Sequence, residues 1–230
     1  MKETAWGVAE QTGFIEQMKV QKGDNQMRIV STPIVGYIHW CKKQDGGIKK
    51  LTCLGRELCP VCAALNEKRE TAIATIEAKT GKEFKLADSY KELREAKAAE
   101  TPDTVLIDAY EAVHACQDER GQKRNIAYVI DRTDGKIKIY EFGKTVRTGI
   151  DELAKDPDFG NPSTYDIKIK RSGDGRDTEY VVVPGKASPL TPEEEEAVAA
   201  LIPLMTLYAP KTIDEIKTYG LACLDDEIPV

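Results

Sequence analysis

The sequence predicts an α+β fold in which a small, partly open β-barrel carries a metal-binding subdomain, a helical insertion and a C-terminal helical segment. Short segments that alternate apolar and polar residues predict the strands, because each such strand buries one face. Two segments with helical spacing interrupt these strands. Strands of this length with an intervening helix fit a barrel of the OB type, although periodicity alone does not separate it from another α+β fold.

The bulk composition is that of a globular chain. It has 230 residues, of which 41% are hydrophobic and 31% charged. This length can bury a core without the help of disulfides. No apolar run approaches the roughly 20 residues that span a bilayer, and the N-terminus lacks the apolar stretch of a signal peptide. We therefore expect a cytoplasmic protein with no membrane partner.

The first half of the chain is predicted to pass from strands to helices. Residues 14–40 alternate around a Gly23-Asp24-Asn25 turn and predict two or three strands. Residues 60–79 have helical spacing, with Gly81 as the stop, and residues 89–99 predict a second, more polar helix. This helical pair is expected to be an insertion between two groups of strands.

The second half is predicted to return to strands before a final helix. A short helix is expected around 146–154, and a Thr191-Pro192-Glu193-Glu194 capping box starts another. The predicted strands are residues 104–116, 125–132, 136–142, 164–171 and 178–184. The expected domain organisation is a core (1–190) that includes a zinc subdomain (about 37–65) and the helical insertion (about 60–100), then a C-terminal helical segment (191–221) and an acidic tail (222–230).

The spacing of His39, Cys53, Cys59 and Cys62 is the most informative motif. The Cys59-Pro60-Val61-Cys62 turn lets two thiolates reach one ion, and Cys53 and His39 can complete a tetrahedral site. Such a closed set predicts one structural Zn²⁺ ion. Cys41 is an alternative to His39, because residues two apart on a strand point to the same face.

The cysteines could also be a few thiols that hold no metal, whereas two other interpretations fit less well. A redox pair would be expected within a thioredoxin-like βαβ unit, which the surrounding pattern lacks. A deaminase-type catalytic zinc site needs a His-x-Glu motif, whereas His39 is followed by Trp40 and Cys41. His114, inside an apolar segment, is expected to be buried, and no carboxylate cluster suits paired metals. The sequence predicts no enzyme.

Charge is distributed unevenly along a chain whose net charge is −6. From Lys19 to Arg56 there are eight basic residues against Asp24 and Asp45, a net of +6. From Ala187 to Val230 there are two lysines against nine acidic residues, a net of −7. A basic early region and an acidic end favour a polyanion site together with an acidic tail.

Binding of single-stranded nucleic acid needs cations along the phosphates and aromatic faces for the bases. Basic and aromatic residues gather in the metal segment, on the predicted strand meander and on the later hairpin. The candidates are Arg28, Trp40, Lys42, Lys43, Lys49, Lys50, Arg124, Tyr128, Arg132, Lys138, Tyr140, Lys168, Lys170 and Arg171. Tyr128 alternates with Ile126 and Ile130, which also fits a buried position.

The chain ends in a cluster of acidic residues followed by an apolar tip. Its members are Asp225, Asp226, Glu227, Ile228, Pro229 and Val230. This end resembles the Asp-Asp-Asp-Ile-Pro-Phe tip of bacterial single-stranded DNA-binding proteins, with Val230 in place of phenylalanine. A carboxylate next to an apolar anchor suits a basic-rimmed pocket on a partner protein.

Several motifs in order resemble the zinc-containing helix-destabilising proteins of T-even and related tailed phages. They are the Lys22-Gly23-Asp24-Asn25 lead-in, the His39…Cys62 ligand set, Tyr128–Arg132, Asp156-Pro157 and the strand pair Asp166–Lys170 and Tyr180–Pro184. The resemblance covers about residues 14–190. It departs at the N-terminus, where MKETAWGVAEQ holds only Lys2 as a cation, whereas the family's prototypes carry a basic arm.

The resemblance implies an OB-fold core with a zinc subdomain and cooperative coverage of single-stranded DNA. We expect sequence-independent binding that protects and organises single-stranded DNA during replication, recombination and repair. The resemblance also implies that the acidic C-terminus contacts replication and recombination proteins, in the host cytoplasm if the chain is phage-encoded. The main alternative is a zinc-stabilised transcription or replication accessory protein that acts through protein–protein contacts. That alternative predicts no binding to oligonucleotides at low salt, whereas the first predicts strong, salt-sensitive binding.

Overall fold

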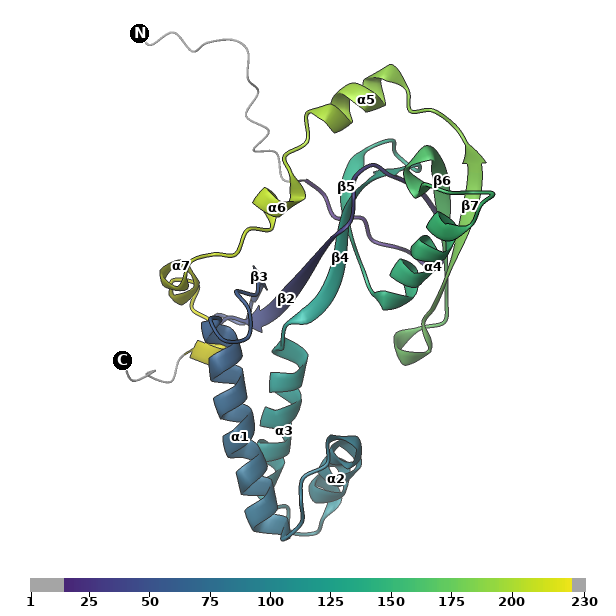
Figure 1. Ribbon diagram of the computed structural model, residues 1–230. Helices are drawn as coiled ribbons and strands as arrows, with labels where there is room; N and C mark the ends of the chain where they lie inside the picture. The colour runs from purple at the N-terminus through teal and green to yellow at the C-terminus, as the bar shows by residue number, and fades with distance from the viewer. Residues whose placement is uncertain (1–14, 225–230) are drawn as a thin grey trace, which may run out of the picture. The chain divides into compact units, whose positions relative to one another are not determined.

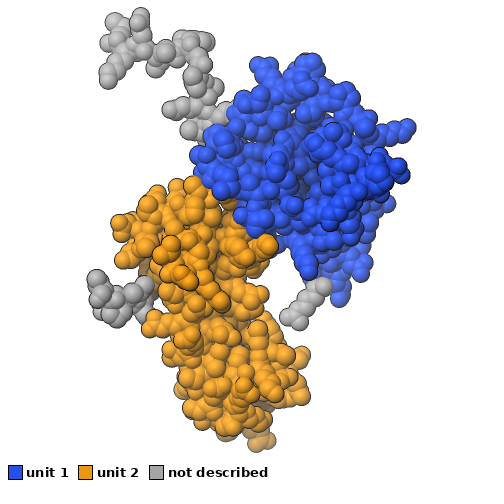
Figure 2. Space-filling model, in the orientation of Figure 1, with its two compact units in different colours: residues 1–35, 124–207 blue, residues 36–123, 208–230 orange. Residues whose placement is uncertain are grey.

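The computed structural model describes residues 15–224, which contain seven β-strands and seven α-helices (Figure 1). The fold is therefore mixed α and β, as predicted. These residues form two compact units, coloured separately in Figure 2. Unit 1 comprises the described parts of 1–35 and 124–207, and unit 2 those of 36–123 and 208–230. No helix among the described residues has the length and apolar character that crossing a membrane requires.

Unit 1 is built on antiparallel strands in the order β5-β4-β1-β6-β7. Their bounds are β1 Gly23–Ile29, β4 Gln122–Asp131 (of which residues from 124 onward belong to unit 1), β5 Ile137–Phe142, β6 Tyr165–Ser172 and β7 Glu179–Ala187. In β6 the buried residues Tyr165, Ile167 and Ile169 alternate with Lys168 and Lys170 on the other face. The period of two thus selects which face of the strand enters the core.

The core of unit 1 lies between these strands and the helix α4 (Lys144–Lys155). Met27, Ile167 and Tyr140 pack with Val146 and Ile150 of the helix in one buried cluster. The predicted helix around 146–154 is confirmed by α4, and the predicted strands 125–132, 136–142, 164–171 and 178–184 by β4 to β7. The helices α5 (Pro192–Ala199) and α6 (Leu204–Leu207) follow β7.

The capping box at Thr191 is confirmed as the start of α5. The Thr191 hydroxyl accepts a hydrogen bond from the Glu194 backbone N–H at 3.2 Å, and the Glu194 carboxylate accepts one from the Thr191 N–H at 3.1 Å. These reciprocal bonds satisfy backbone donors that the first turn of a helix leaves free. The sequence signal was sufficient here because every partner lies within one helical turn.

Unit 2 joins a hairpin to a set of helices. The hairpin consists of β2 (Ile34–Lys42), of which residues from 36 onward belong to unit 2, and β3 (Ile48–Thr52). The helices are α1 (Pro60–Thr80), α2 (Leu86–Ala98), α3 (Thr104–Glu119) and the short α7 (Ile213–Lys217). The predicted helices 60–79 and 89–99 are confirmed by α1 and α2. Gly81 ends α1 in the left-handed conformation (φ 67°), which favours glycine.

The predicted strand at residues 104–116 is wrong, because this segment forms the helix α3. Its buried residues Ala109, Tyr110, Val113 and Cys116 follow helical spacing, and α3 packs side by side with α1 (Figure 1). The Asp103 carboxylate starts the helix by accepting a hydrogen bond from the Leu106 N–H at 3.1 Å. Burial against α1 therefore outweighs the β propensity of the apolar run.

Candidate metal centre and nucleic-acid interface

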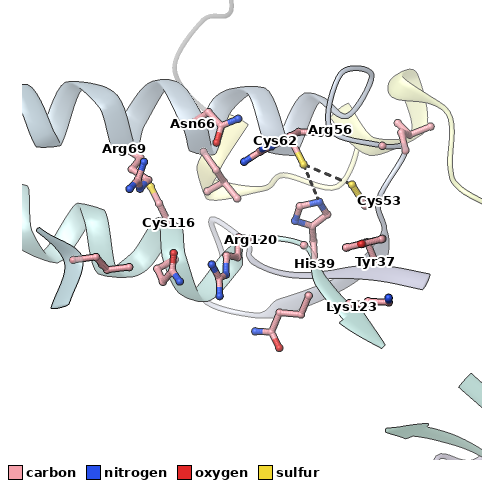
Figure 3. Close-up of a pocket in the computed structure, with 17 residues that line it drawn as sticks. Tyr37, His39, Cys53, Arg56, Cys62, Asn66, Arg69, Cys116, Arg120 and Lys123 are labelled. Carbon is pink, nitrogen blue, oxygen red and sulfur yellow. Dashed lines mark hydrogen bonds between the residues drawn. The ribbon is translucent and has the colours of Figure 1, made fainter. Parts of the chain in front are cut away.

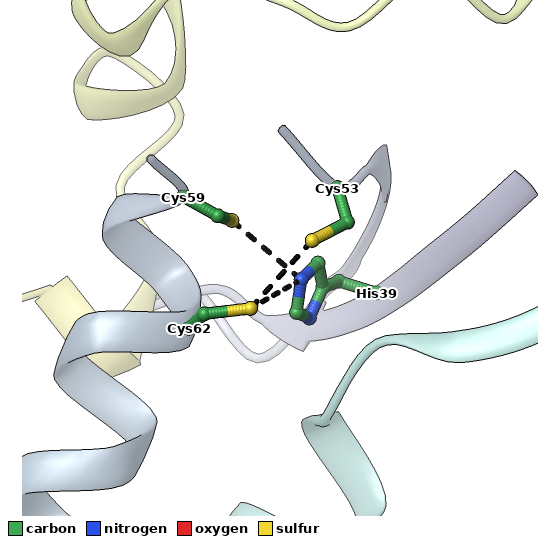
Figure 4. Close-up of side chains that lie close together, drawn as sticks. All are labelled: His39, Cys53, Cys59 and Cys62. Atoms are coloured by element: carbon green, nitrogen blue, oxygen red, sulfur yellow. Dashed lines mark hydrogen bonds between the residues drawn. The ribbon is translucent and has the colours of Figure 1, made fainter. Parts of the chain in front are cut away.

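Four side chains from three parts of unit 2 converge on one point (Figure 4). His39 comes from β2, Cys53 follows β3, and Cys59 and Cys62 lie at the start of α1. Their ligand atoms all lie within 4.8 Å of one another. The Cys53 and Cys62 sulfurs are 3.6 Å apart, and His39 Nε2 lies 3.6 Å from Cys59 Sγ and 3.5 Å from Cys62 Sγ. These four side chains could hold one metal ion.

The local structure explains how Cys59 and Cys62 come together. Pro60 is at the first position of α1, where its fixed φ suits a helix and its missing N–H costs no hydrogen bond. The Cys59 N–H donates to the Gly55 carbonyl at 2.9 Å, which closes the loop between Cys53 and the helix. One helical turn then brings Cys62 back beside Cys59.

Hydrogen bonds within the group shift the pKa of Cys59 in favour of metal binding and the pKa of His39 against it, because a metal binds a thiolate and a neutral imidazole. Burial raises the pKa of the Cys59 thiol, but hydrogen bonds with His39 and with the backbone of Cys62 and Leu54 outweigh burial and lower the pKa to about 6. Burial lowers the pKa of His39, while its bonds to Cys59 and to the Glu119 carbonyl raise it to about 9. The site thus favours an ionised Cys59, which is the form that binds metals.

The backbone of α3 orients the histidine. His39 Nδ1 lies 2.9 Å from the Glu119 carbonyl oxygen, so that Nε2 is turned toward the thiols. A carbonyl partner of this kind fixes the ring orientation of metal-binding histidines. Cys41, the alternative ligand, is placed elsewhere: it belongs to a second group with Glu119 and Cys223.

A pocket of about 1170 Å³ opens beside the metal-ligand group, entirely within unit 2 (Figure 3). His39, Cys53 and Cys62 form part of its wall. Four basic residues from different elements also line it: Arg56, Arg69, Arg120 and Lys123. None of its lining residues is Asp or Glu, so we call it the cationic pocket. It combines a positive charge of four with the exposed ring of Tyr37, which is 52% accessible.

The cationic pocket was not predicted from the sequence, although one signal pointed to it. Cys62, Asn66 and Arg69 are spaced four and then three residues apart, which places them on one face of α1. A helix that begins at a metal site therefore carries Arg69 along the same side. The contributions of Tyr37, Arg120 and Lys123 depend on contacts between distant segments and had no local signal.

Several predicted DNA-binding residues lie inside unit 1. Arg28 is 1% exposed; it donates to Asp166 Oδ1 at 2.8 Å and to the Ser188 carbonyl at 3.0 Å. The predicted contacts with buried side chains are Arg28, Tyr128, Lys138 and Tyr140. Arg132 is partly buried and pairs with Asp166 and Glu194. Ion pairs or core packing thus already engage the side chains of these five residues.

The other predicted residues have more varied surroundings. Lys49 and Lys50 lie over the rings of Tyr219 and Tyr208, with Nζ 4.1 and 5.2 Å from the ring centroids. Lys168 pairs with Asp24 at 3.1 Å. Lys43 pairs with Asp45, Arg171 donates to the Val20 carbonyl, Lys42 and Lys170 are exposed, and Trp40 and Arg124 are half-buried. The predicted tip, residues 225–230, lies outside the described residues.

The comparisons with known proteins point to one relative. No family model matches the sequence, and no solved structure matches it. A protein of Escherichia phage T5, named "Probable ssDNA-binding protein", is 29% identical over 182 residues. The match covers 77% of this chain and 59% of the relative, so the chain spans less than two thirds of that protein's length. Most of this chain is therefore similar to a phage protein named for binding single-stranded DNA.

Proposed function

We propose that this protein binds single-stranded DNA without sequence preference and that the cationic pocket of unit 2 holds the strand. The observation that carries the proposal is the pocket's charge: four basic side chains and no carboxylate, in a chain whose net charge is −6. Phosphates of a single strand need such a cationic track, and the bases need an aromatic face. Tyr37 offers that face. The name of the phage T5 relative supports the same function.

We propose Zn²⁺ as the ion held by His39, Cys53, Cys59 and Cys62. A tetrahedral zinc site with bonds of about 2.3 Å to sulfur and about 2.05 Å to nitrogen has edges of roughly 3.8 Å between sulfurs and roughly 3.6 Å between sulfur and nitrogen. The distances of 3.5 to 3.6 Å fit these edges. With four protein ligands the ion is structural. It would join three segments that line the cationic pocket, namely β2, the segment after β3 and α1.

The other parts of the proposal follow the predicted family. The number of strands in unit 1, five, equals that of an OB barrel, which supports this barrel type as an interpretation. We further propose roles in replication, recombination and repair, in the cytoplasm of the host cell. The tip Asp225–Val230 would recruit replication and recombination proteins. Binding without catalysis accords with the name of the relative.

The test is an anisotropy titration of the zinc-loaded protein with a labelled oligo-dT at about 50 and 300 mM salt. We expect binding that weakens steeply with salt. Replacing one phosphate-contacting cation in Arg69→Ala should weaken binding by about tenfold and reduce the salt slope by about 0.7. Arg94→Ala is the matched control, since Arg94 is exposed on α2 and does not line the pocket.

The outcomes separate the two candidate functions. No binding at low salt would refute the proposal and favour an accessory protein that acts through protein–protein contacts. Binding that Arg69→Ala and Arg94→Ala weaken equally would keep the function but move the DNA surface away from the cationic pocket.

A further inference from the structure

A second group of potential metal ligands lies in unit 2, apart from the first. Cys41 is on β2, Glu119 is the last residue of α3, and Cys223 is in a short 3-10 helix, Ala222–Leu224. One ligand atom from each lies within 4.8 Å of the others. We propose that these three residues form a second metal site, for a thiophilic divalent cation such as Zn²⁺.

The surroundings of Glu119 argue for a cation. This residue is only 7% exposed, and its carboxylate accepts a hydrogen bond from the Lys42 backbone N–H at 3.2 Å. Within residues 15–224, no lysine or arginine forms an ion pair with it, and the thiols of Cys41 and Cys223 lie within 4.8 Å of its carboxylate. A buried carboxylate with one neutral donor is poorly compensated, and a bound metal ion would neutralise it.

The donor set suits the same class of ion. Two thiolates and a carboxylate oxygen are ligands that zinc accepts, whereas Mg²⁺ and Ca²⁺ prefer sites made of oxygen alone. Both cysteines are free, so their sulfurs are available. Three protein ligands leave one tetrahedral position for water. This open position distinguishes the second site from the closed Cys3His group.

Backbone bonds bring the third ligand into place. The Gln44 N–H donates to the Gly220 carbonyl at 2.9 Å, and Lys43 forms an isolated antiparallel bridge with Leu221. Cys223 thus reaches Cys41 from a segment about 180 residues further along the chain. A metal ion here would fasten the C-terminal segment to β2, as a crosslink that closes a long loop.

Glu119 would contribute to both metal sites, through its backbone to the first and through its side chain to the second. Its carbonyl faces His39 Nδ1 at 2.9 Å, while its carboxylate faces Cys41 and Cys223. The backbone of one residue therefore orients a ligand of the first ion, and its side chain binds the second. The two sites are therefore linked through one residue without sharing a ligand atom.

The test is metal analysis of the full-length protein after loading with Zn²⁺ and removal of excess metal. We expect about two equivalents per chain, and about one in Cys223→Ala and in Glu119→Gln. Cys116→Ala is the control and should keep both ions, since Cys116 is a buried cysteine of the same hydrophobic cluster that belongs to neither group. Loading with Co²⁺ should give a second thiolate charge-transfer band that Cys223→Ala removes.

The stoichiometry of the unmodified chain decides the outcome even if a variant fails to fold. About one equivalent of Zn²⁺ in the wild-type protein, with Cys41 and Cys223 free to react with a thiol reagent, would overturn the proposal. A disulfide between these two cysteines in the metal-loaded protein would overturn it as well. Neither result depends on DNA binding, so the second site and the proposed function fail separately.

Discussion

Arg28 has the positive charge that binding to a phosphate requires, yet its side chain is buried in unit 1 and paired with Asp166. Its guanidinium is held by Asp166 at 2.8 Å and by both the carbonyl and the hydroxyl of Ser188. Asp166 also accepts from Arg132, so one carboxylate joins two arginines. A buried arginine with all these partners stabilises unit 1 by joining β1 to β6 and to the segment after β7, and these bonds engage all three of its guanidinium nitrogens.

Asp166→Asn is therefore expected to lower the free energy of unfolding by about 3 kcal/mol, because it leaves the buried Arg28 charge without its partner. Chemical denaturation at neutral pH measures this loss. Asp24→Asn is the control: Asp24 pairs with Lys168 on the surface, where an ion pair contributes less than about 1 kcal/mol. Equal effects of the two substitutions would contradict the prediction.

The pH dependence of Asp166 has a definite sign. Burial raises its pKa, but the hydrogen bond and charge of Arg132 and the charge of Arg28 outweigh burial and lower it. The stabilisation from a carboxyl with a lowered pKa is present above its unfolded pKa of about 3.9 and is lost as the pH falls through the folded pKa. The deficit of Asp166→Asn should accordingly shrink below about pH 4.

At the scale of elements, the turn between α3 and β4 constrains the position of the metal-ligand histidine. A Cβ atom on Gly121 would lie 3.3 Å from both Cε1 and Nε2 of His39, which is closer than most contacts of this kind. The absence of a side chain at this position lets β4 begin directly against the ligand histidine. Glycine is needed here for space, since its φ is not in the left-handed region.

Gly121→Val should displace the His39 ring and speed the loss of metal to a chelator, whereas Gly121→Ala should have a smaller effect in the same direction. The reason is that valine adds two methyl groups where a single Cβ already makes a tight contact. The rate of zinc transfer to a coloured chelator measures the change. If both variants release metal as slowly as the wild type, the contact does not constrain the site.

The helix α3 was predicted as a strand because its first residues are compatible with both structures. Its run of Val105, Leu106 and Ile107 fits a buried strand as well as a buried helix, because periodicity over a few apolar residues does not separate the two. The helical evidence was in the sequence: Asp103 is a good N-cap, and Tyr110, Val113 and Cys116 repeat at helical spacing. Contact with α1 decides between these patterns, since it buries one helical face.

At the scale of the whole molecule, each unit has a core of its own. The buried cluster of unit 1 consists of strand residues and α4, while unit 2 has one cluster around the cysteines and another between α1 and α3. The cluster around the cysteines contains Cys59 and is packed against Cys53 and Cys62. Metal binding should therefore stabilise one part of one unit.

Chelation of the metal is expected to raise amide hydrogen exchange in β2, β3 and the first turns of α1, while β4 to β7 keep their protection. The reason is that the ligands of the first site join those elements and no strand of unit 1 contributes a ligand. Hydrogen exchange with mass spectrometry, before and after re-addition of Zn²⁺, measures the effect. A uniform rise throughout the chain would show that the metal supports both units.

The sequence by itself determined features whose partners lie close together along the chain. The Cys59-Pro60-Val61-Cys62 turn, the Thr191 capping box and the alternating strand β6 all depend on neighbours within a few residues. Local propensity and periodicity describe such features well. These signals predicted most elements and the metal-ligand group.

Only the tertiary structure decided which charges are free and which side chains share a site. Arg28 and Arg69 have the same chemistry, yet long-range packing buries the first against Asp166 and places the second in the cationic pocket. His39 and Cys41 share one strand face but belong to different ligand groups. At the end of α3, the Glu119 carbonyl contacts His39, whereas the Glu119 carboxylate lies near Cys41. Burial and ion pairing depend on segments distant in sequence, and for that reason no local pattern reveals them.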